Sequence, residues 1–527
     1  MALLDKISAP LTAKAAEHLL RRTMFGATRT DIAALTGKTI DQALDTLLAT
    51  QAAPPVPVNP TSGQTWLNAT TRDQNDGANI RYMKAWWLGL MATQPISITE
   101  KMTLFWHNHF ASAWSVVNDS RHMYKQNALL RSSALGNFKT LVREISFDPA
   151  MLVYLNGISN TNVAPQENYA RELQELFTIG KGAEVSAGNY TTYTEQDVRA
   201  AARVLTGWTV TNTTVTSNFV SNRHDTNAKQ FSAAYQNTII LGRSGATAGL
   251  DELNDLLNMI FRQNATSEYI CRKLYRFFVN FEVTPTVERE VIVPLGKTLR
   301  DNNFEIKPVL RQLLGSQHFF DANLIGCMIK TPLDLVIGLV RQMQINFPKL
   351  ATQREYYYLY FDQLANLATT LQMNVFELPN VAGWSAYYQE PLFYQIWINS
   401  ATMPTRADLS NRLINGWRLT NAAMAQLPVT FDSVAFLEQF PNPEDVLKVM
   451  DNLTEHFFAI DLTNSQKDEL ISNQLLPGLP GTEAMEWRDD WNDYKRTPTD
   501  IAKKTVIQRR LNTLIQYMIK LAEYQMM

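Results

Sequence analysis

Apolar and polar positions along this chain repeat mainly with the period of an α-helix. The clearest case lies near the C-terminus, where Ile507, Leu511, Leu514, Met518 and Leu521 are spaced by three and four residues. This spacing places the five side chains in one stripe on a helix. A helix of this kind usually packs its stripe against the core of its own protein, so we expect it to dock there instead of binding a partner.

Three segments have the form of a capping box, in which a Ser or Thr side chain and an acidic side chain three residues later bind the free amides at a helix start. They are Thr28–Asp31, Ser97–Glu100 and Thr194–Asp197. Pro165 suits the first turn of another helix, which we expect to extend from Gln166 to about Ile179. Helix signals therefore dominate the first two hundred residues.

Three stretches interrupt the helical pattern. Residues 51–63 are rich in Pro and predict a surface loop, and residues 475–481 have the composition of a turn-rich connector. Residues 209–249 are dense in Thr, Asn, Ser and β-branched residues, which favours a strand pair or a long excursion inserted between helices. The chain is thus predicted to be mainly α, with a main helical domain over 1–430, a small β-containing insertion around 209–243, and a helical subdomain over 431–527.

Composition narrows the classes of protein. The 527 residues are 45% hydrophobic and 19% charged, which is typical of a globular protein. Lys and Arg number 48 against 50 Asp and Glu, for a net charge of −2. With no long run of either sign, we expect no nucleic-acid surface. No stretch approaches the roughly 20 apolar residues of a membrane span.

The N-terminal residues and the two cysteines bear on the cellular compartment of the protein. The first residues lack the apolar core of a signal peptide, which predicts a cytoplasmic protein, or an exported one if a leader has been removed. Cys271 and Cys327 are the only cysteines, which fits a reduced compartment; a single bridge between them is the alternative.

Two of the seven histidines lie within the aromatic segment Ser97–Phe110. At about 100° per residue, His107 and His109 point about 200° apart, so one regular helix cannot direct both at the same ion. His109 shares a face with Met102 and Phe105, so we expect it in the core. His107 faces the other way and is the candidate for chemistry, with a buried, hydrogen-bonded ring as the alternative. Within the same segment, Glu100 is expected to cap the start of the helix, and the alternative is that its carboxylate belongs to a site.

The segment Pro165–Phe177 is the second cluster of chemically capable residues. Its polar face carries Glu167, Asn168, Arg171, Glu172 and Glu175. One interpretation is a solvated face with an ion pair between positions 171 and 175. The other places a carboxylate of position 172 or 175 opposite the histidine at 107, in a proton-transfer or metal site.

A third cluster is Arg223–Asp225, inside the β-containing insertion. A His-Asp pair on a loop can complete a site carried by helices, and it can equally form an Asx turn. The predicted catalytic residues are His107, Glu172, Glu175, His224 and Asp225. The predicted substrate-binding residues are Arg171 and Trp208. The predicted ligands of a divalent transition metal are His107, Glu172 and His224.

These segments follow one another in an order that is known from a bacterial family. The matching motifs are His18–Gly26, Glu100–Phe110, Asp148–Leu152, Glu167–Phe177, Tyr193–Arg199, Leu205–Trp208, His224–Asp225, Lys330–Pro332 and Pro379–Trp384. On these motifs the chain resembles the "domain of unknown function 1800" family over roughly residues 15 to 415, and more weakly after about 430. The resemblance implies a predominantly helical and often exported protein with no established general activity.

Further consequences of the resemblance concern single positions. The family's motif positions include His107, His109, Glu167, Arg171, Glu172, Glu175, His224 and Asp225, but the resemblance assigns none of them a role. The missing export signal departs from the family pattern and leaves the location of this chain open.

Two functions are consistent with these residues. The first is an enzyme, a metal-assisted or acid/base hydrolase or oxidoreductase, in which Arg171 orients an anionic substrate. The second is a non-catalytic binding or assembly protein, in which the same residues form a buried polar network. Eleven Trp and 19 Tyr would then supply a surface for a small molecule, a glycan or a protein. The sequence does not determine the oligomeric state.

Overall fold

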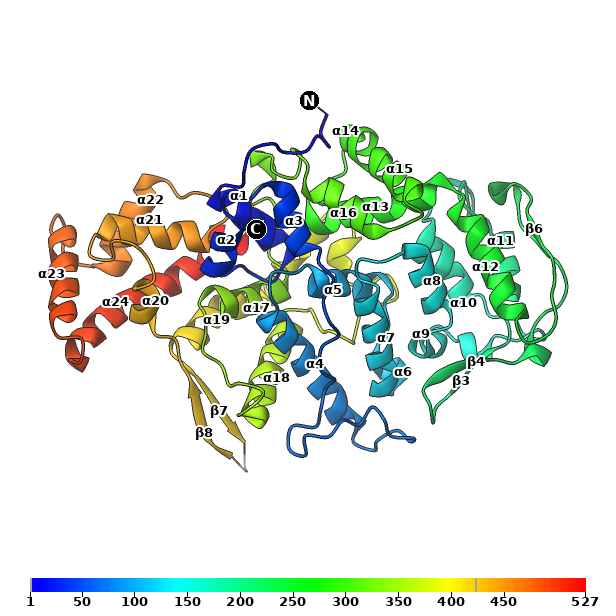
Figure 1. Cartoon of the computed structure of the whole chain (residues 1–527), viewed down its shortest axis with the longest axis horizontal. Helices are drawn as coiled ribbons and strands as arrows, with labels where there is room; N and C mark the ends of the chain where they lie inside the picture. The colour runs from blue at the N-terminus through cyan, green and yellow to red at the C-terminus, as the bar shows by residue number, and fades with distance from the viewer. Residues whose placement is uncertain (1, 422–423) are drawn as a thin grey trace.

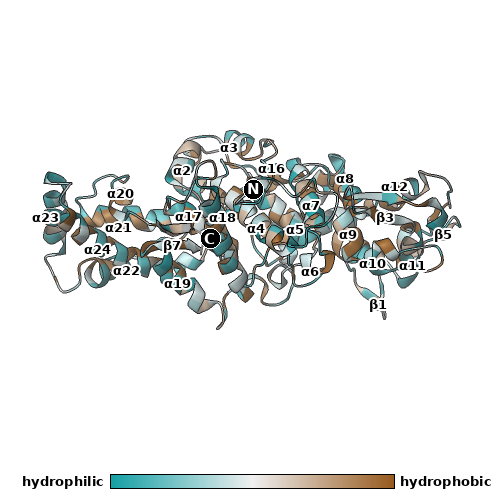
Figure 2. Ribbon diagram, turned by 90° about the horizontal axis from the view of Figure 1, so that it is seen from below, coloured by the Kyte–Doolittle hydropathy of each residue, from teal (hydrophilic) through white to brown (hydrophobic). Residues whose placement is uncertain are grey.

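A computed structural model describes residues 2–421 and 424–527 of the chain. The protein is mainly helical and elongated, as Figures 1 and 2 show from two sides, with apolar residues along its whole length. Helices α20 to α24 form one end, helices α10 to α12 with strands β3 to β6 form the other, and α4, α5, α17 and α18 lie between them (Figure 1). The prediction of a mainly α protein is confirmed.

The helices of the first half carry the aromatic segment and the polar motifs. They are α1 (Ala13–Thr23), α2 (Arg29–Leu35), α3 (Ile40–Leu47), α4 (Asp76–Thr93), α5 (Thr99–His109), α6 (Trp114–Val117), α7 (Ser120–Ser132), α8 (Phe138–Ser146), α9 (Pro149–Tyr154), α10 (Asn168–Glu172) with the π-helix η2 (Leu173–Thr178), and α11 (Glu195–Val204).

The helices of the second half complete the body. They are α12 (Ala248–Phe261), α13 (Asn264–Phe278), α14 (Pro285–Val287) with the π-helix η5 (Glu288–Ile292), α15 (Val293–Asp301), α16 (Ile306–Leu314), α17 (Pro332–Gln342), α18 (Arg354–Thr370), α19 (Met403–Ile414), α20 (Ser433–Leu437), α21 (Val446–Phe457), α22 (Asn464–Leu470) with the π-helix η9 (Ile471–Leu475), α23 (Glu483–Arg496) and α24 (Ile501–Lys520).

The strands form four separate two-stranded antiparallel sheets. Their bounds are β1 (Glu184–Ser186), β2 (Asn189–Tyr190), β3 (Trp208–Thr211), β4 (Thr216–Phe219), β5 (Lys229–Gln230), β6 (Ile239–Ile240), β7 (Trp417–Asn421) and β8 (Met424–Val429). Strands β3 to β6 lie in the predicted insertion, which confirms it. The pairs β1–β2 and β7–β8 were not predicted, because neither has a strong alternating pattern.

Helix α5 lies between two hydrophobic clusters. The first cluster gathers residues of α4, α17, α18 and the C-terminal helices, and it includes Leu104 of α5. The second gathers residues of α1, α8, α12, α13 and α16, and it includes Phe105 and Trp106 of α5. A helix with apolar contacts on all sides has no solvent face. This position explains why nearly every side chain of α5 is buried.

The predicted helix starts are confirmed at two positions out of three. Complete capping boxes form at Thr28–Asp31 and Thr194–Asp197. The box at Ser97–Glu100 does not form, because the helix begins after Ile98 and the Glu100 carboxylate turns inward. That carboxylate accepts hydrogen bonds from the Trp87 indole at 2.7 Å and from Arg131 at 2.8 and 3.0 Å. A buried guanidinium and indole therefore bind the side chain that was expected to cap α5.

The C-terminal stripe docks as predicted. On α24, Ile507, Leu511, Leu514 and Met518 are fully buried, and Leu521 follows the helix half-buried. These residues belong to the same hydrophobic cluster as α4 and α18. The stripe therefore covers the protein's own core.

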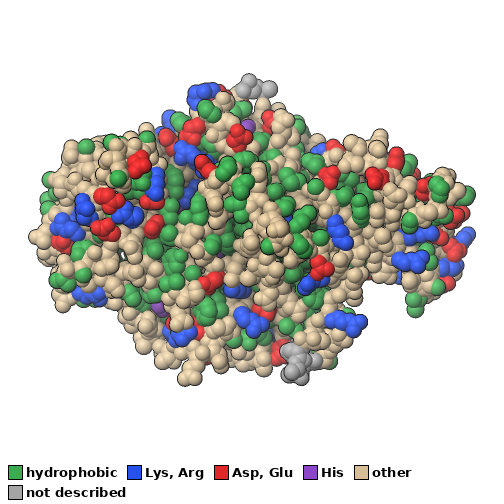
Figure 3. Space-filling view, turned by 180° about the vertical axis from the view of Figure 1, so that it is seen from behind, with side chains coloured by type: hydrophobic (Ala, Val, Ile, Leu, Met, Phe, Trp, Pro, Cys, Tyr) green, Lys and Arg blue, Asp and Glu red, His purple; other side chains and the backbone are tan. Residues whose placement is uncertain are grey.

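The structure also bears on the predicted loop, the cysteines, the expected absence of a membrane span and the surface charge. Residues 51–63 form turns and extended chain without a helix or strand, as predicted. Both cysteines are free thiols, so the alternative of a bridge does not hold. None of the helices in the described ranges combines the length and apolar character needed to cross a membrane. On the face in Figure 3, positive and negative side chains are intermixed instead of forming a patch of one sign.

Candidate functional site

His107 lies in the interior of the protein on α5. Its ring is 1% exposed and meets the rings of Trp87 and Phe376 edge-on, with centroids 5.2 Å apart in both cases. Nε2 accepts a hydrogen bond from the Phe376 backbone amide at 3.0 Å, which assigns the ring proton to Nδ1. Burial lowers the pKa of His107 to about 3, so the ring is neutral at physiological pH. A buried, hydrogen-bonded histidine, the alternative interpretation, describes this residue.

His109 connects α5 to the π-helix η2 and to α13. Its Nε2 donates to the Phe177 carbonyl at 3.0 Å, and its Nδ1 accepts from the Lys273 ammonium at 3.2 Å. Burial holds the pKa of His109 well below its usual value, and the nearby Lys273 charge lowers it further. The expectation that His109 is a core residue is confirmed, and the ring also holds one carbonyl of η2.

The π-helix η2 is stabilised by side chains that bind its carbonyl groups. In a π-helix the backbone bonds join residues i and i+5, so the ladder of the preceding α-helix is interrupted. The Leu176 carbonyl accepts from the Tyr269 hydroxyl and the Lys273 ammonium, both at 3.1 Å. The Gln174 amide donates to the Ala170 carbonyl at 3.0 Å. Helices α5 and α13 therefore fix this turn from outside.

Glu172 ends α10, at the point where the π-helix begins. Its carboxyl is half-buried and makes no hydrogen bond or ion pair with any side chain in residues 2–421 and 424–527. Burial raises the pKa of Glu172 to about 7, and the neighbouring Glu175 charge contributes to the rise. Glu172 is thus a carboxyl group that is only partly ionised at neutral pH.

Glu175 and Arg171 are paired, but not with each other. Glu175 accepts from the Tyr193 hydroxyl at 2.7 Å and pairs with Lys181 at 2.6 Å. Arg171 forms a two-pronged ion pair with Glu195 at 2.5 and 2.9 Å. The expected i,i+4 pair between positions 171 and 175 is therefore wrong, because the chain changes from α to π geometry between them. Arg171 is engaged by carboxylates of its own chain.

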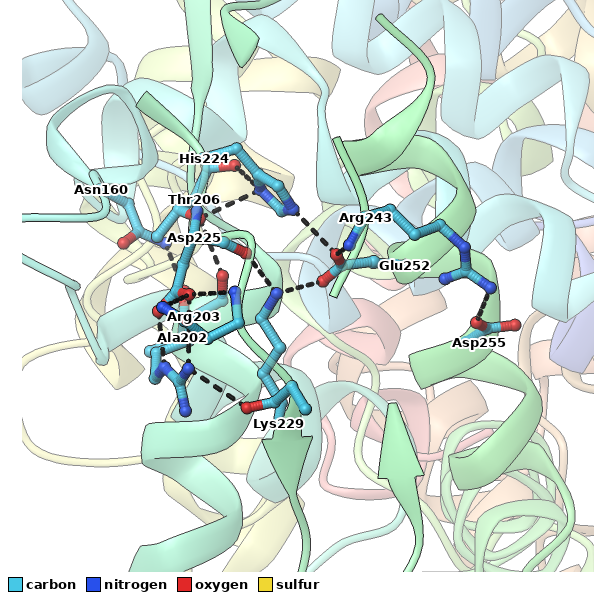
Figure 4. A network of polar contacts seen from close by, with 12 residues as sticks. Asn160, Ala202, Arg203, Thr206, His224, Asp225, Lys229, Arg243, Glu252 and Asp255 are labelled. Carbon is cyan, nitrogen blue, oxygen red and sulfur yellow. Dashed lines mark hydrogen bonds and ion pairs between the residues drawn. The ribbon is translucent and has the colours of Figure 1, made fainter. Parts of the chain in front are cut away.

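His224 belongs to a different network, shown in Figure 4, in which His224, Lys229 and Glu252 are fully buried. Its Nδ1 lies 3.0 Å from the Thr206 carbonyl, and its Nε2 lies 3.1 Å from the Glu252 carboxylate. The same carboxylate pairs with Lys229 at 2.5 Å and accepts from the Arg243 backbone amide at 2.7 Å. Burial alone would raise the pKa of Glu252, but these donors lower it. The contacts with the Glu252 carboxylate join the insertion to α12.

Asp225 faces away from this carboxylate toward α11. It pairs with Arg203 at 2.6 Å and accepts from the Asn227 backbone amide at 2.8 Å, which is an Asx turn. Burial tends to raise the pKa of Asp225, but these donors lower it to about 2. Trp208 begins β3, where its indole stacks on Phe147 with centroids 5.1 Å apart and is 8% exposed. Both residues are engaged in local structure.

The three predicted metal ligands contact different surroundings. The His107 ring is bound to the Phe376 amide, and the His224 ring to Thr206 and Glu252. Glu172 lies where α10 passes into the π-helix η2, a junction that we call the π-turn. Within the described ranges, no three His, Cys, Asp or Glu side chains are grouped so that they could hold a metal ion. The structure brings together Glu172 and Glu175 but does not gather the three ligands.

Four residues of the site were missed from the sequence: Tyr193, Glu195, Tyr269 and Lys273. Lys273 is the most informative, because burial and the neighbouring Arg276 charge together lower its pKa to about 7. It lies on α13 among Tyr and Phe residues, and a lysine surrounded by apolar residues in the sequence is the pattern from which a buried lysine could have been predicted. Tyr193 precedes the capping box at 194–197 and Glu195 lies inside it, so the local pattern indicates a helix start and gives no sign of their partners in the site.

Comparison with known proteins places the chain in one family. A sequence profile described as "Protein of unknown function (DUF1800)" matches residues 18–526. The match covers nearly the whole chain and extends through the C-terminal segment, where the motifs are weaker. No curated protein and no solved structure matches significantly.

Proposed function

Because the chain belongs to this family of unknown function, we propose its activity from the site alone: it is an acid/base enzyme in which Glu172 transfers a proton. The observation that carries the proposal is the half-buried Glu172 carboxyl, which has no partner among the described residues and whose pKa is raised to about 7. A group with a pKa near the working pH is the most effective proton carrier, because it is populated in both forms. Perturbed, unpaired groups of this kind are candidates for active-site residues.

The surroundings of Glu172 support the proposal. The Glu175 carboxylate is fixed by Tyr193 and Lys181, so its charge stays beside Glu172 and disfavours a second anion there. The phenols of Tyr154 and Tyr269 lie within electrostatic reach of Glu172: burial raises the pKa of both, and the Glu172 charge contributes, after that of Glu377 for Tyr154 and after that of Glu175 for Tyr269. π-Helical turns frequently occur at functional sites. Glu172 would act as the acid or base, and Glu175 as a positioning residue.

The acid/base form of the hypothesis is preferred over the metal-assisted form. The metal-assisted form requires His107 and His224 as ligands. Nε2 of His107 already accepts from the Phe376 amide, and Nε2 of His224 faces the Glu252 carboxylate in a separate buried network. We therefore assign His107, His224 and Asp225 to the scaffold and keep Glu172 as the reacting group.

The test is a steady-state assay on p-nitrophenyl esters, glycosides and phosphates across pH 5 to 9. We expect turnover with a pH limb near 7, and a loss of at least about 100-fold in kcat/KM for Glu172→Gln. Glu167→Gln is the matched control, because Glu167 lies one turn earlier and pairs with Arg171. Equal turnover of wild type and Glu172→Gln on a hydrolysed substrate would refute the role of Glu172.

A second candidate is a non-catalytic binding or assembly protein. The buried network around Glu252 favours it, because the contacts of the Glu252 carboxylate with His224, Lys229 and the Arg243 amide fix the insertion on α12. If the wild-type protein turns over no member of the panel, this second function becomes the better account.

A further inference from the structure

A cavity of about 570 Å³ lies apart from the π-turn. Its walls come from the end of α4, the start of α5, one face of α7, the loop over residues 50–54, and one lysine of α16. None of Glu172, Glu175, Tyr193 or Lys273 lines it. Its volume is within the range of about 300 to 1,000 Å³ that is typical of small-molecule sites.

The charges in the wall leave one cation unpaired. Glu100 and Arg131 bind each other at 2.8 and 3.0 Å, and the third side of the guanidinium donates to Asn127 at 2.7 Å. These two charges cancel. Lys307 also lines the cavity, is half-buried, and makes no ion pair or hydrogen bond through its side chain within residues 2–421 and 424–527. The net charge of the wall is therefore positive, which favours an anionic group.

An unsatisfied amide lies in the same wall. Both side-chain atoms of Gln94, Nε2 and Oε1, are buried and have no hydrogen-bond partner among the described residues. Buried polar atoms without a partner are uncommon in folded proteins, and each needs an explanation. Because water cannot reach either atom, the Gln94 amide lies behind the cavity surface and adds no contact to a molecule bound in the cavity.

The rest of the wall combines apolar side chains with uncharged polar ones, which are Thr50, Gln51, Thr93, Ser97, Thr99 and Ser132. Leu90 of α4, Tyr124 and Ala128 of α7, Leu135 and Pro54 all line the cavity. A cavity with apolar walls and a few placed polar groups is the usual form of a ligand site. We propose that this cavity binds an amphipathic small molecule with a carboxylate, in which Lys307 pairs with the carboxylate and the apolar part of the wall covers a hydrocarbon chain.

The experiment uses N-octanoylglycine as the probe and the uncharged N-octanoylglycinamide as its match, both titrated into the full chain by calorimetry. The acid is expected to bind, and the amide to bind at least about tenfold more weakly, because it lacks the charged contact. Lys307→Gln is expected to weaken the acid by about the same factor and to leave the amide unchanged. Lys139→Gln is the control, since Lys139 lies on the adjacent helix α8 and does not line the cavity.

A second variant tests the location of binding. Ala128→Phe places a ring inside the cavity and is expected to abolish binding of both probes, with thermal unfolding used to verify that the protein is folded. The proposal is overturned if wild type gives no binding, if acid and amide bind equally, or if Lys307→Gln or a folded Ala128→Phe protein binds as wild type does.

Discussion

Replacing Glu172 by Gln is the most direct perturbation of the proposed site. Glutamine has nearly the shape of a protonated glutamate, so Glu172→Gln fixes the uncharged form at every pH. The folded protein favours that form, since the pKa of Glu172 is raised to about 7. The unfolded chain has the usual pKa of about 4.3. As pH rises through this window, the folded state holds the proton longer than the unfolded state, so wild type loses stability with increasing pH.

The magnitude follows from the two pKa values. The difference between about 4.3 and about 7 sets a ceiling of about 3.7 kcal/mol for the destabilisation at full ionisation. The carboxyl is only half-buried, so solvent screens part of this penalty and we expect about 1–2 kcal/mol. Glu172→Gln removes the penalty. The variant is therefore expected to gain stability over wild type at pH 8, and clearly less at pH 5, where Glu172 is protonated in the folded state.

Urea unfolding at pH 5 and pH 8 measures this difference. Glu175→Gln is the matched control on the same turn, because its carboxylate is paired with Lys181 and Tyr193. We expect that variant to lose stability at pH 8, the opposite sign. If Glu172→Gln shows the same change at both pH values, or a loss at pH 8, then the pKa of Glu172 is not raised and the argument for its role fails.

Two further predictions concern the scaffold. Glu252→Ala is expected to lower the free energy of unfolding by about 3–5 kcal/mol in a urea titration, because it leaves the buried Lys229 ammonium without its carboxylate. Asp255→Ala is the control, because it breaks an exposed ion pair on the same helix and is expected to change the free energy of unfolding by less than about 1 kcal/mol. Gly383→Ala is expected to cost at least about 2 kcal/mol by thermal unfolding, because φ is +87° and the new Cβ would lie 2.3 Å from the Asn108 side-chain oxygen. Gly245→Ala, with φ +96° and open space around it, is expected to cost about 1 kcal/mol.

Much of the fold follows from local patterns in the sequence. The stripe on α24, the capping boxes at 28–31 and 194–197, and the β-containing insertion depend on nearby residues, and all are present. The box at Ser97–Glu100 fails because Glu100 meets Arg131, a residue far along the chain. Local propensity alone does not predict such a contact, since a buried guanidinium binds a carboxylate more strongly than one helix amide does.

The site was harder to predict because α5 has no exposed face. A helix with one apolar side would place His109 in the core and His107 in a cleft. Helix α5 instead separates two hydrophobic clusters, so both His107 and His109 are buried and neutral. The distinction between them is one of partners: His107 binds the Phe376 amide, while His109 holds a carbonyl of η2.

The π-turn links the failed prediction to the proposed function. Counting in steps of four predicts that Arg171 and Glu175 pair, but the interval between them crosses into η2, where bonds run from i to i+5. Glu175 is consequently bound by Lys181 and Tyr193, while Arg171 is bound by Glu195. No cation of the turn is then left to pair with the carboxyl at position 172. The same change of helical period that defeats the sequence pattern therefore leaves Glu172 unpaired, half-buried and partly protonated at neutral pH.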